Sequence, residues 1–220
     1  MEDAGISQDI TVRARIRFGR RIVDWSSINI SKGFSLRPLF TVHAGEFLVG
    51  EHIERTFRSL NVWIPAKDTG VDLLVTDVGA RNSVSLQVKL SRDYRLPEAR
   101  DAFELSLVAA GWLALSHEKI EKSSAEWWVI VLVSHERKMK PQFIVIRPAE
   151  LLRRFVRIHG KAKRYNFYPW VTKSGLCLDG RGLRKQERAR LAGDSLDLGP
   201  RDLSPFLNNW SCLHHLSKGK

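Results

Sequence analysis

Cysteine is scarce in this sequence, and long apolar runs are missing. Only two cysteines occur, Cys177 and Cys212, and neither belongs to a paired motif. The simplest setting is a reducing one, although two cysteines could still form one bridge. The longest apolar run, Trp127 to Val133, is too short to span a bilayer and predicts a buried strand. The chain starts with acidic residues and shows no hydrophobic signal region, so we expect a cytoplasmic protein without a membrane partner.

Several sequence motifs that carry chemistry are also missing. There is no internal repeat, low-complexity tract or heptad pattern, and no Gly-rich phosphate loop or nucleophilic Ser or Cys motif is evident. Cys212 is followed by His214 and His215, but no second cluster accompanies them, and zinc needs about four ligands. We therefore expect these three residues to lie in a C-terminal tail and not in a metal site.

Positive charge, in contrast, is abundant and concentrated. The net charge is +12 and the isoelectric point is near 10.1. Residues 151–190 contain twelve Lys or Arg against two Asp or Glu, a local charge of +10. A concentrated basic field attracts polyanions, so nucleic acid is the leading partner. A basic surface without any partner is the alternative.

The pattern of helix and strand signals predicts an α/β fold. The 220 residues, 43% of them hydrophobic, suit one globular domain with small appendages. Helices are predicted at 44–60, 98–116 and 149–159, the second opened by Pro97. Strands are predicted at 11–16, 71–77, 83–91, 126–134 and 142–146, and beyond Gly160 the sequence becomes irregular apart from an apolar run at 176–178. This mixture predicts a mixed central β-sheet flanked by helices.

Polar residues occupy one face of the predicted strand at 83–91. In SVSLQVKL the apolar residues alternate with polar ones, so Gln87 and Lys89 project side by side from one face. The preceding strand, VDLLV, places Asp72 among apolar residues, where an ionised carboxylate is costly unless it is paired or binds a metal. A hairpin between the two strands would bring Asp72 close to Gln87 and Lys89.

This combination of groups suits phosphate chemistry. A carboxylate, an amide oxygen and nearby backbone carbonyls, such as that of Val88, form a hard oxygen site suited to Mg²⁺, with Mn²⁺ as an alternative. Lys89 beside it could orient or deprotonate a water, or stabilise a pentavalent phosphate. The other interpretation is that Asp72 serves as a cap or forms a structural salt bridge with Lys89.

The helix predicted at 44–60 carries one more acidic candidate. Its apolar stripe is predicted to consist of Phe47, Gly50, Ile53, Phe57 and Leu60. Glu46 lies near the middle of this stripe, and a carboxylate on a core-facing side is explained if it points into the same metal site. Gly50 would let the helix approach the sheet closely.

The run GEFLVGEHIE, then DTGVDLLV, then LQVK resembles the PD-(D/E)XK nuclease superfamily, which includes many type II restriction enzymes, junction resolvases and repair nucleases. The family pattern is a helix glutamate, a strand aspartate and an (E/D/Q)-x-K tripeptide on the next strand, which correspond here to Glu46, Asp72, Gln87 and Lys89. The sequence departs from the pattern at Val71, where the family name implies proline, and at Gln87, where an acid is commoner. The resemblance is specific over about 44–91 and loose over 92–147.

The resemblance implies a restriction-endonuclease-like core and Mg²⁺-dependent hydrolysis of DNA phosphodiesters. Asp72, Glu46, Gln87 and the Val88 carbonyl would hold the metal, and Lys89 would position the attacking water. A restriction-type endonuclease that dimerises to cut both strands of double-stranded DNA is the expected function. A repair or junction-resolving nuclease of the same fold and a catalytically inactive nucleic-acid-binding protein are the alternatives.

The remaining basic segments are candidates for nucleic-acid contacts. We expect a nuclease core at 41–160, an N-terminal extension at 1–40 that could supply an edge strand, and a basic, aromatic-containing region at 161–220 packed on the core. Aromatics among cations in RYNFYPWVTKSG could stack on bases or form a small satellite core. The segment RGLRKQERAR could follow a DNA backbone or be a solvated loop. The candidate contacts are Arg13, Arg15, Lys161, Lys163, Arg164, Lys173, Arg181, Arg184 and Lys185.

Overall fold

The computed structural model describes residues 16–18, 21–23, 44–66, 69–93, 101–133, 140–192 and 197–217. The chain divides into two compact units, Met1–Pro38 and Leu39–Lys220. In the first unit, strands β1 (Ile16–Phe18) and β2 (Arg21–Val23) pair antiparallel. The strand predicted at 11–16 lies outside the described residues except for Ile16, and so do Arg13 and Arg15.

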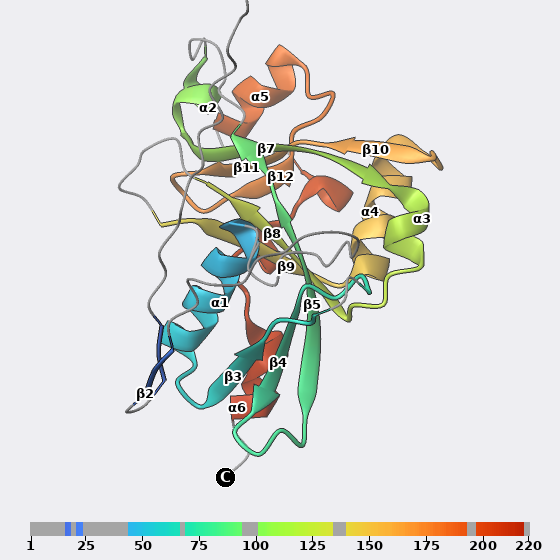
Figure 1. Cartoon of the computed structure of the whole chain (residues 1–220). Coiled ribbons are helices and arrows are strands. Elements are labelled where there is room, and N and C mark those ends of the chain that lie inside the picture. Colours follow the sequence, from blue (N-terminus) through green and yellow to red (C-terminus); the bar gives the residue numbers. More distant parts are fainter. Residues whose placement is uncertain are drawn as a thin grey trace, which may run out of the picture. The chain divides into compact units, whose positions relative to one another are not determined.

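A mixed five-stranded sheet forms the centre of the second unit (Figure 1). In spatial order its strands are β3 (Leu60–Trp63), β4 (Leu73–Asp77), β5 (Ser83–Leu90), β8 (Trp127–Leu132) and β9 (Gln142–Ile146). All neighbours are antiparallel except β5 and β8, which run parallel. Two parallel neighbours must be joined by a long crossover connection, and the chain between β5 and β8 contains further secondary-structure elements.

Helices cover both faces of the central sheet. Successive side chains of β8 point to opposite faces of the sheet and belong to two buried clusters. Val129 and Val131 pack in one cluster with Val49 of α1 (Ala44–Thr56). Trp128 and Ile130 pack in the other, which α3 (His117–Glu121) and α4 (Pro148–His159) close with residues such as Phe155. The predicted fold class, a mixed central sheet flanked by helices, is therefore confirmed.

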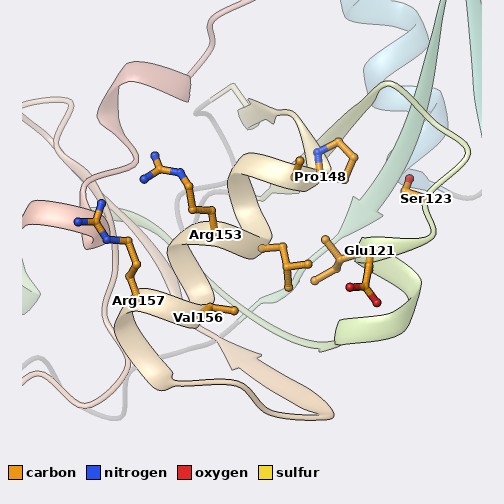
Figure 2. A pocket seen from close by; sticks show the side chains of 9 residues that line it. Glu121, Ser123, Pro148, Arg153, Val156 and Arg157 are labelled. Atoms are coloured by element: carbon orange, nitrogen blue, oxygen red, sulfur yellow. The ribbon is translucent and has the colours of Figure 1, made fainter.

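An apolar cavity lies between α3 and α4 (Figure 2). Its volume is about 590 Å³, and its lining includes Ile120 of α3 and Leu152 and Val156 of α4. Arg153 and Arg157 belong to its rim, and Figure 2 shows both side chains extending from α4 away from α3. The cavity is thus apolar inside, with cations on one outer side.

The helix predicted at 98–116 is wrong, because most of that segment is a strand. Of its described residues, 101–116, only α2 (Ala102–Leu105) is helical, and β7 (Leu107–Ser116) begins two residues after it ends. β7 is the centre of a second sheet, whose other strands are β6 (Arg92–Asp93), β10 (Arg164–Phe167), β11 (Pro169–Thr172) and β12 (Cys177–Asp179). The Leu- and Ala-rich composition favours a helix locally, but pairing with distant strands overrides that preference.

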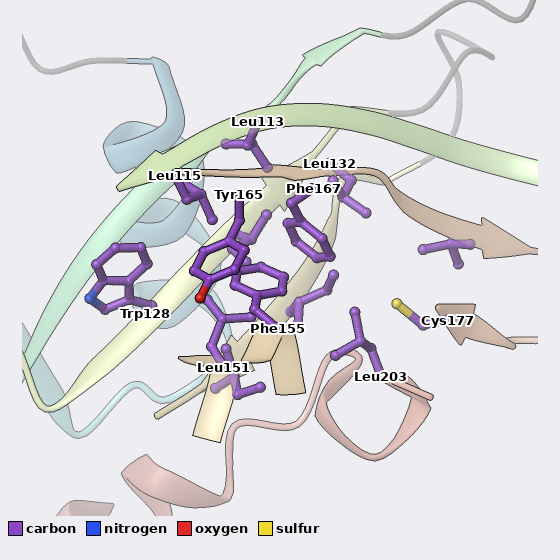
Figure 3. Close-up of a cluster of buried hydrophobic side chains, with 14 of the residues drawn as sticks. Leu113, Leu115, Trp128, Leu132, Leu151, Phe155, Tyr165, Phe167, Cys177 and Leu203 are labelled. Carbon is purple, nitrogen blue, oxygen red and sulfur yellow. The ribbon is translucent and has the colours of Figure 1, made fainter. Parts of the chain in front are cut away.

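The aromatic segment after Gly160 contributes to the core. Tyr165 and Phe167 of β10 are fully buried beside Phe155 of α4 (Figure 3). Trp170 of β11 is buried in a smaller cluster. Each such side chain stabilises the fold by roughly 1.5–3 kcal/mol. Of the two interpretations of these aromatics, the core one is confirmed, and the segment after Gly160, where the sequence pattern is irregular, contains the strands β10, β11 and β12.

Helix α1 is rotated relative to the predicted stripe. Its buried residues are Gly45, Val49 and Ile53, whereas Phe47 is 61% exposed. The helix ends at Thr56, and Leu60 already begins β3. The close approach to the sheet is made at Gly45 and not at Gly50, because a Cβ on Gly45 would lie 3.0 Å from Cβ of Leu90.

The described C-terminal residues, up to Ser217, are packed on the fold, so the tail expected at Cys212, His214 and His215 is wrong. Helix α5 (Lys185–Ala192) and the 3₁₀ turns η1 (Gly199–Arg201), η2 (Ser204–Phe206) and η3 (Ser211–Leu213) lead to α6 (His214–Ser217). Cys212, Leu213 and Leu216 are buried in the same cluster as α1. In the described part of the chain, no helix combines the length and the apolar character that crossing a membrane requires.

Candidate active site

Asp72 lies immediately before β4 and is fixed against β5. Its backbone N–H donates to the carbonyl of Leu86 at 2.8 Å, and its Oδ2 accepts a hydrogen bond from the backbone N–H of Val88 at 2.6 Å. The side chain is only 15% exposed. The expected hairpin therefore exists, and it holds the Asp72 carboxylate against the residue that precedes Lys89.

Lys89 completes an ion pair with the same oxygen. Its Nζ lies 4.0 Å from Oδ2 of Asp72, and the side chain is 31% exposed. The ammonium also lies over the indole ring of Trp128, 5.6 Å from the ring centroid. A cation over an aromatic face is stabilised by the ring quadrupole, so two groups hold Lys89 in place.

Trp128 is a contributor that the sequence pattern did not identify. It is almost completely buried, and its Nε1–H donates to Oγ of Ser123 at 2.8 Å. Because β5 and β8 are parallel neighbours, Trp128 pairs in register with Gln87. The face of the sheet that carries Gln87 and Lys89 is therefore the face covered by α3 and α4.

Gln87 is half-buried and lies two residues before Lys89 on β5. Val88, between them, has its side chain on the opposite face, in the cluster with α1. The two polar side chains thus share a face as the alternation predicted, and the Val88 backbone runs directly beside Asp72.

Glu46 is half-buried in the first turn of α1. The Cβ position of Gly45 lies 3.2 Å from Cγ1 of Val88 and 3.0 Å from Cβ of Leu90, the residues on either side of Lys89. The start of α1 therefore lies beside the part of β5 that carries Lys89. The helix that bears Glu46 thus begins at the same end of β5 as the Asp72–Lys89 pair, but it packs on the Val88 face of the sheet, opposite Gln87 and Lys89.

A second carboxylate is held near the base of this strand. Oε2 of Glu126 accepts hydrogen bonds from the backbone N–H of Ser85 at 2.9 Å and from its hydroxyl at 3.3 Å. Ser85 shares the polar face with Gln87. The neighbouring Ser124 donates to the carbonyl of Thr69 at 2.7 Å, which ties the connection before β8 to the segment that leads to Asp72.

The donors gathered here are oxygen atoms, the type of ligand that a hard divalent ion prefers. Asp72 offers a carboxylate, Gln87 an amide oxygen and Val88 a backbone carbonyl, all on one short stretch of sheet, and oxygen donors are the ligands that Mg²⁺ prefers. Among the described residues, no group of three or more His, Cys, Asp or Glu side chains could hold a metal ion. A metal at this place would therefore depend on amide and carbonyl oxygens as well as on carboxylates.

The described structure does not favour a cysteine nucleophile. Burial raises the pKa of the Cys177 thiol far above its ordinary range and raises that of Cys212 to about 12. Both cysteines are free and buried. A thiolate nucleophile would need the opposite shift and an accessible sulfur.

The candidate nucleic-acid contacts differ in their surroundings. Lys161, Lys163 and Arg164 are exposed where α4 leads into β10, Lys173 is exposed between β11 and β12, and Arg184 and Lys185 are exposed at the start of α5. Arg181, in contrast, is half-buried, and its guanidinium donates to the carbonyl of Asn166 at 3.3 Å. The segment at 181–190, for which a solvated loop was an alternative, is largely the helix α5.

Comparisons with known proteins do not identify this chain. No family model matches the chain, and comparisons with curated proteins and with solved structures gave no match. What the site can do must therefore be inferred from its own side chains.

Proposed function

We propose that this protein is a metal-dependent endonuclease that hydrolyses phosphodiester bonds in double-stranded DNA. The observation that carries the proposal is the Asp72 carboxylate held between the Val88 N–H and the Lys89 ammonium. Structural ion pairs are common, but this one is partly exposed beside Gln87 on a sheet that is otherwise apolar at its centre. A cluster of charged side chains at such a position is a candidate catalytic site.

Lys89 supplies the positive charge that a phosphodiester attracts. A phosphate oxygen within reach of Nζ would gain a charge-assisted hydrogen bond, and that bond strengthens as negative charge develops during attack by water. Trp128 and Asp72 hold the ammonium from two sides, so its position does not depend on the substrate. Lys89 is thus the group that would orient the phosphate or the attacking water.

The oxygen atoms of Asp72, Gln87 and Val88, together with Glu46, would hold the ion. When bound there, Mg²⁺ or Mn²⁺ would polarise a phosphoryl oxygen and lower the pKa of a bound water. Gln87 carries no charge, so the carboxylates of Asp72 and Glu46 would provide the negative charge that retains the ion.

The order of elements supports a restriction-endonuclease-like core. Glu46 lies on a helix, Asp72 directly before β4 and the Gln87–Lys89 tripeptide on β5, which is the arrangement that the family resemblance implies. The segments from β10 to α6 would then be the basic extension of that core. A restriction-type enzyme acting as a homodimer is our preferred form, and a repair or junction-resolving nuclease is the near alternative.

Incubation of supercoiled plasmid with the full chain tests this function. We expect nicked and linear DNA with Mg²⁺ and unchanged plasmid with EDTA. Discrete fragments from a long linear DNA would support the restriction-type form, and smeared products would favour another nuclease. Tight binding without metal-dependent cutting would instead support a non-catalytic DNA-binding protein.

A further inference from the structure

The cations of residues 151–190 fall into two groups when their contacts are compared. Four of them are held by the protein itself. Arg153 and Arg154 bind Glu150, Arg188 lies 3.2 Å from Asp101 and 3.3 Å from Glu104, and Arg181 donates to a backbone carbonyl. These side chains are engaged in contacts within the protein, so they are poor candidates for phosphate contacts.

A second group is exposed and clustered in eight residues. Arg157, Lys161, Lys163 and Arg164 are all exposed, and the segment 157–164 contains no acidic residue. Arg157 lies in the last turn of α4, where a cation also complements the helix dipole. The other three follow within one turn and the start of β10, so the four charges occupy one end of α4.

Among the residues that the structure describes, no acidic side chain of a neighbouring element forms an ion pair with this cluster. Helix α3 is tied to it, because the backbone N–H of His117 donates to the carbonyl of Lys163 at 3.0 Å. The acidic residues of α3 are engaged locally: Glu118 pairs with Lys122 at 2.9 Å, and Glu121 lies 3.8 Å from His117. At α5, in contrast, Glu187 accepts a hydrogen bond from the backbone N–H of Arg184, and acidic residues of α2 contact Arg188. The end of α4 therefore presents four exposed cations that form no ion pair with an acidic side chain of the described residues.

The cluster also lies on the same side of the central sheet as the candidate site. Phe155 of α4 packs in the buried cluster that contains Trp128, and Lys89 lies over the Trp128 ring. A polyanion bound along the end of α4 would therefore remain on the face of the sheet from which Gln87 and Lys89 project. Helix α5, in contrast, packs against α2 and does not share the buried cluster that contains Trp128.

We propose that Arg157, Lys161, Lys163 and Arg164 form the principal surface by which this protein binds the phosphate backbone of duplex DNA. Tyr165 and Phe167, the aromatic residues next to the cluster, are fully buried, so they offer no ring on which an unpaired base could stack. Contacts made by exposed cations alone position a duplex without reading its sequence. This inference rests on the proposed function for its choice of partner, but not on catalysis.

The test measures binding of a fluorescent 20-base-pair duplex in EDTA over a range of salt concentrations. The variant replaces Arg157, Lys161, Lys163 and Arg164 with Gln. The matched control replaces Arg58, Arg81, Lys119 and Lys140 with Gln, which removes the same charge from exposed positions that are not candidate contacts. Thermal unfolding of both variants verifies that they fold.

We expect the variant at the end of α4 to bind at least about tenfold more weakly at 0.1 M salt, with a log–log salt slope smaller by about 3–4 units. The control variant should retain most of the DNA affinity and most of the salt slope. Equal losses in the two variants, or a larger loss in the control, would overturn the assignment. If the parent protein cuts plasmid but the α4 variant binds DNA as tightly as the parent, the nuclease proposal stands and only the inference about this surface is overturned. Parent protein that binds through the cluster without cutting would overturn only the nuclease.

Discussion

Oδ2 of Asp72 lies 2.6 Å from the backbone nitrogen of Val88, a residue sixteen positions further along the chain. This bond connects the start of β4 to the middle of the polar stretch on β5. Its donor is a backbone group, so it does not depend on any side chain of β5. The hydrogen bond that Asp72 accepts can therefore be tested separately from the negative charge of its carboxylate.

Replacing Asp72 with Asn should preserve the fold, whereas replacing it with Ala should weaken it. The Asn amide oxygen can still accept from Val88 N–H, but Ala leaves that buried donor without a partner, which costs about 1–3 kcal/mol. Urea unfolding measures both free energies. If the Ala variant is as stable as the Asn variant, the hydrogen bond does not hold this segment.

Gly111 of β7 has no room for a side chain. A Cβ there would lie 2.2 Å from Oγ of Ser91 and 2.8 Å from Cδ2 of Leu132. Gly111→Ala should therefore lower the free energy of unfolding by about 1–3 kcal/mol. Gly79→Ala is the control, because its nearest neighbour is the flexible Arg81 side chain at 3.6 Å, and it should change stability by less than about 0.5 kcal/mol. Equal stability of the two variants would contradict the close packing of β7 against Ser91.

Arg154 and Arg153 both bind Glu150, but only Arg154 also connects other segments. Its guanidinium donates to the carbonyls of Pro200 and Asp202, and its side chain is 15% exposed. Burial acts to raise the pKa of Glu150, but the hydrogen bonds and charges of Arg153 and Arg154 outweigh it and lower the pKa overall.

Arg154→Met should therefore cost about 2–3 kcal/mol, because two carbonyls and a carboxylate lose a charged donor. The more exposed Arg153→Met should cost no more than about 1 kcal/mol. Calorimetric melting of the two variants provides the comparison. A larger effect from Arg153 would show that η1 and η2 are held by something else.

His52 should make stability depend on pH. Its ring packs against Phe143 and Trp210, with centroid distances of 4.8 and 5.0 Å. Burial, followed by the charge of Lys140, lowers the pKa of His52 below the ordinary 6.5. The unfolded chain then binds a proton more readily than the folded one. The contribution of His52 to stability is therefore present above pH 6.5 and is lost as the pH falls through 6.5 towards the lower folded pKa.

His52→Phe keeps a ring in this stack and removes the titrating group. Its melting temperature should fall less than that of the parent between pH 7.5 and 5.5, whereas the exposed His215→Ala should behave like the parent. Parallel melting curves for the parent and His52→Phe across this range would exclude His52 as the source.

Local patterns were sufficient for part of the fold. The alternation in β5 and the apolar run of β9 predicted both strands closely, and the helix at 149–159 begins one residue earlier, at Pro148. The segment 107–116 could not be predicted in this way. Its residues 108–111 are all buried, so neither a two-residue nor a helical period is visible, and the small Ala and Gly residues reflect packing against other strands.

The candidate site was predictable to a similar degree. The shared face of Gln87 and Lys89 follows from strand alternation, and the contact of Asp72 follows from a tight hairpin. Trp128 beneath Lys89 could not be predicted, because it depends on the parallel pairing of β5 and β8 across a long crossover. Which cations are exposed and which are bound internally depends likewise on contacts between distant segments, as Arg154 and Arg181 illustrate.

Cleavage by charge-removing variants tests the nuclease assignment most directly. Initial rates of plasmid nicking in Mg²⁺ should be measured for the parent, Asp72→Asn, Lys89→Met and the control Lys119→Met, which removes an exposed lysine of α3. We predict that the first two variants lose at least about 100-fold in rate while remaining folded, and that the control stays near the parent rate. Folded Asp72→Asn and Lys89→Met proteins that nick plasmid at the parent rate would contradict the proposed active site.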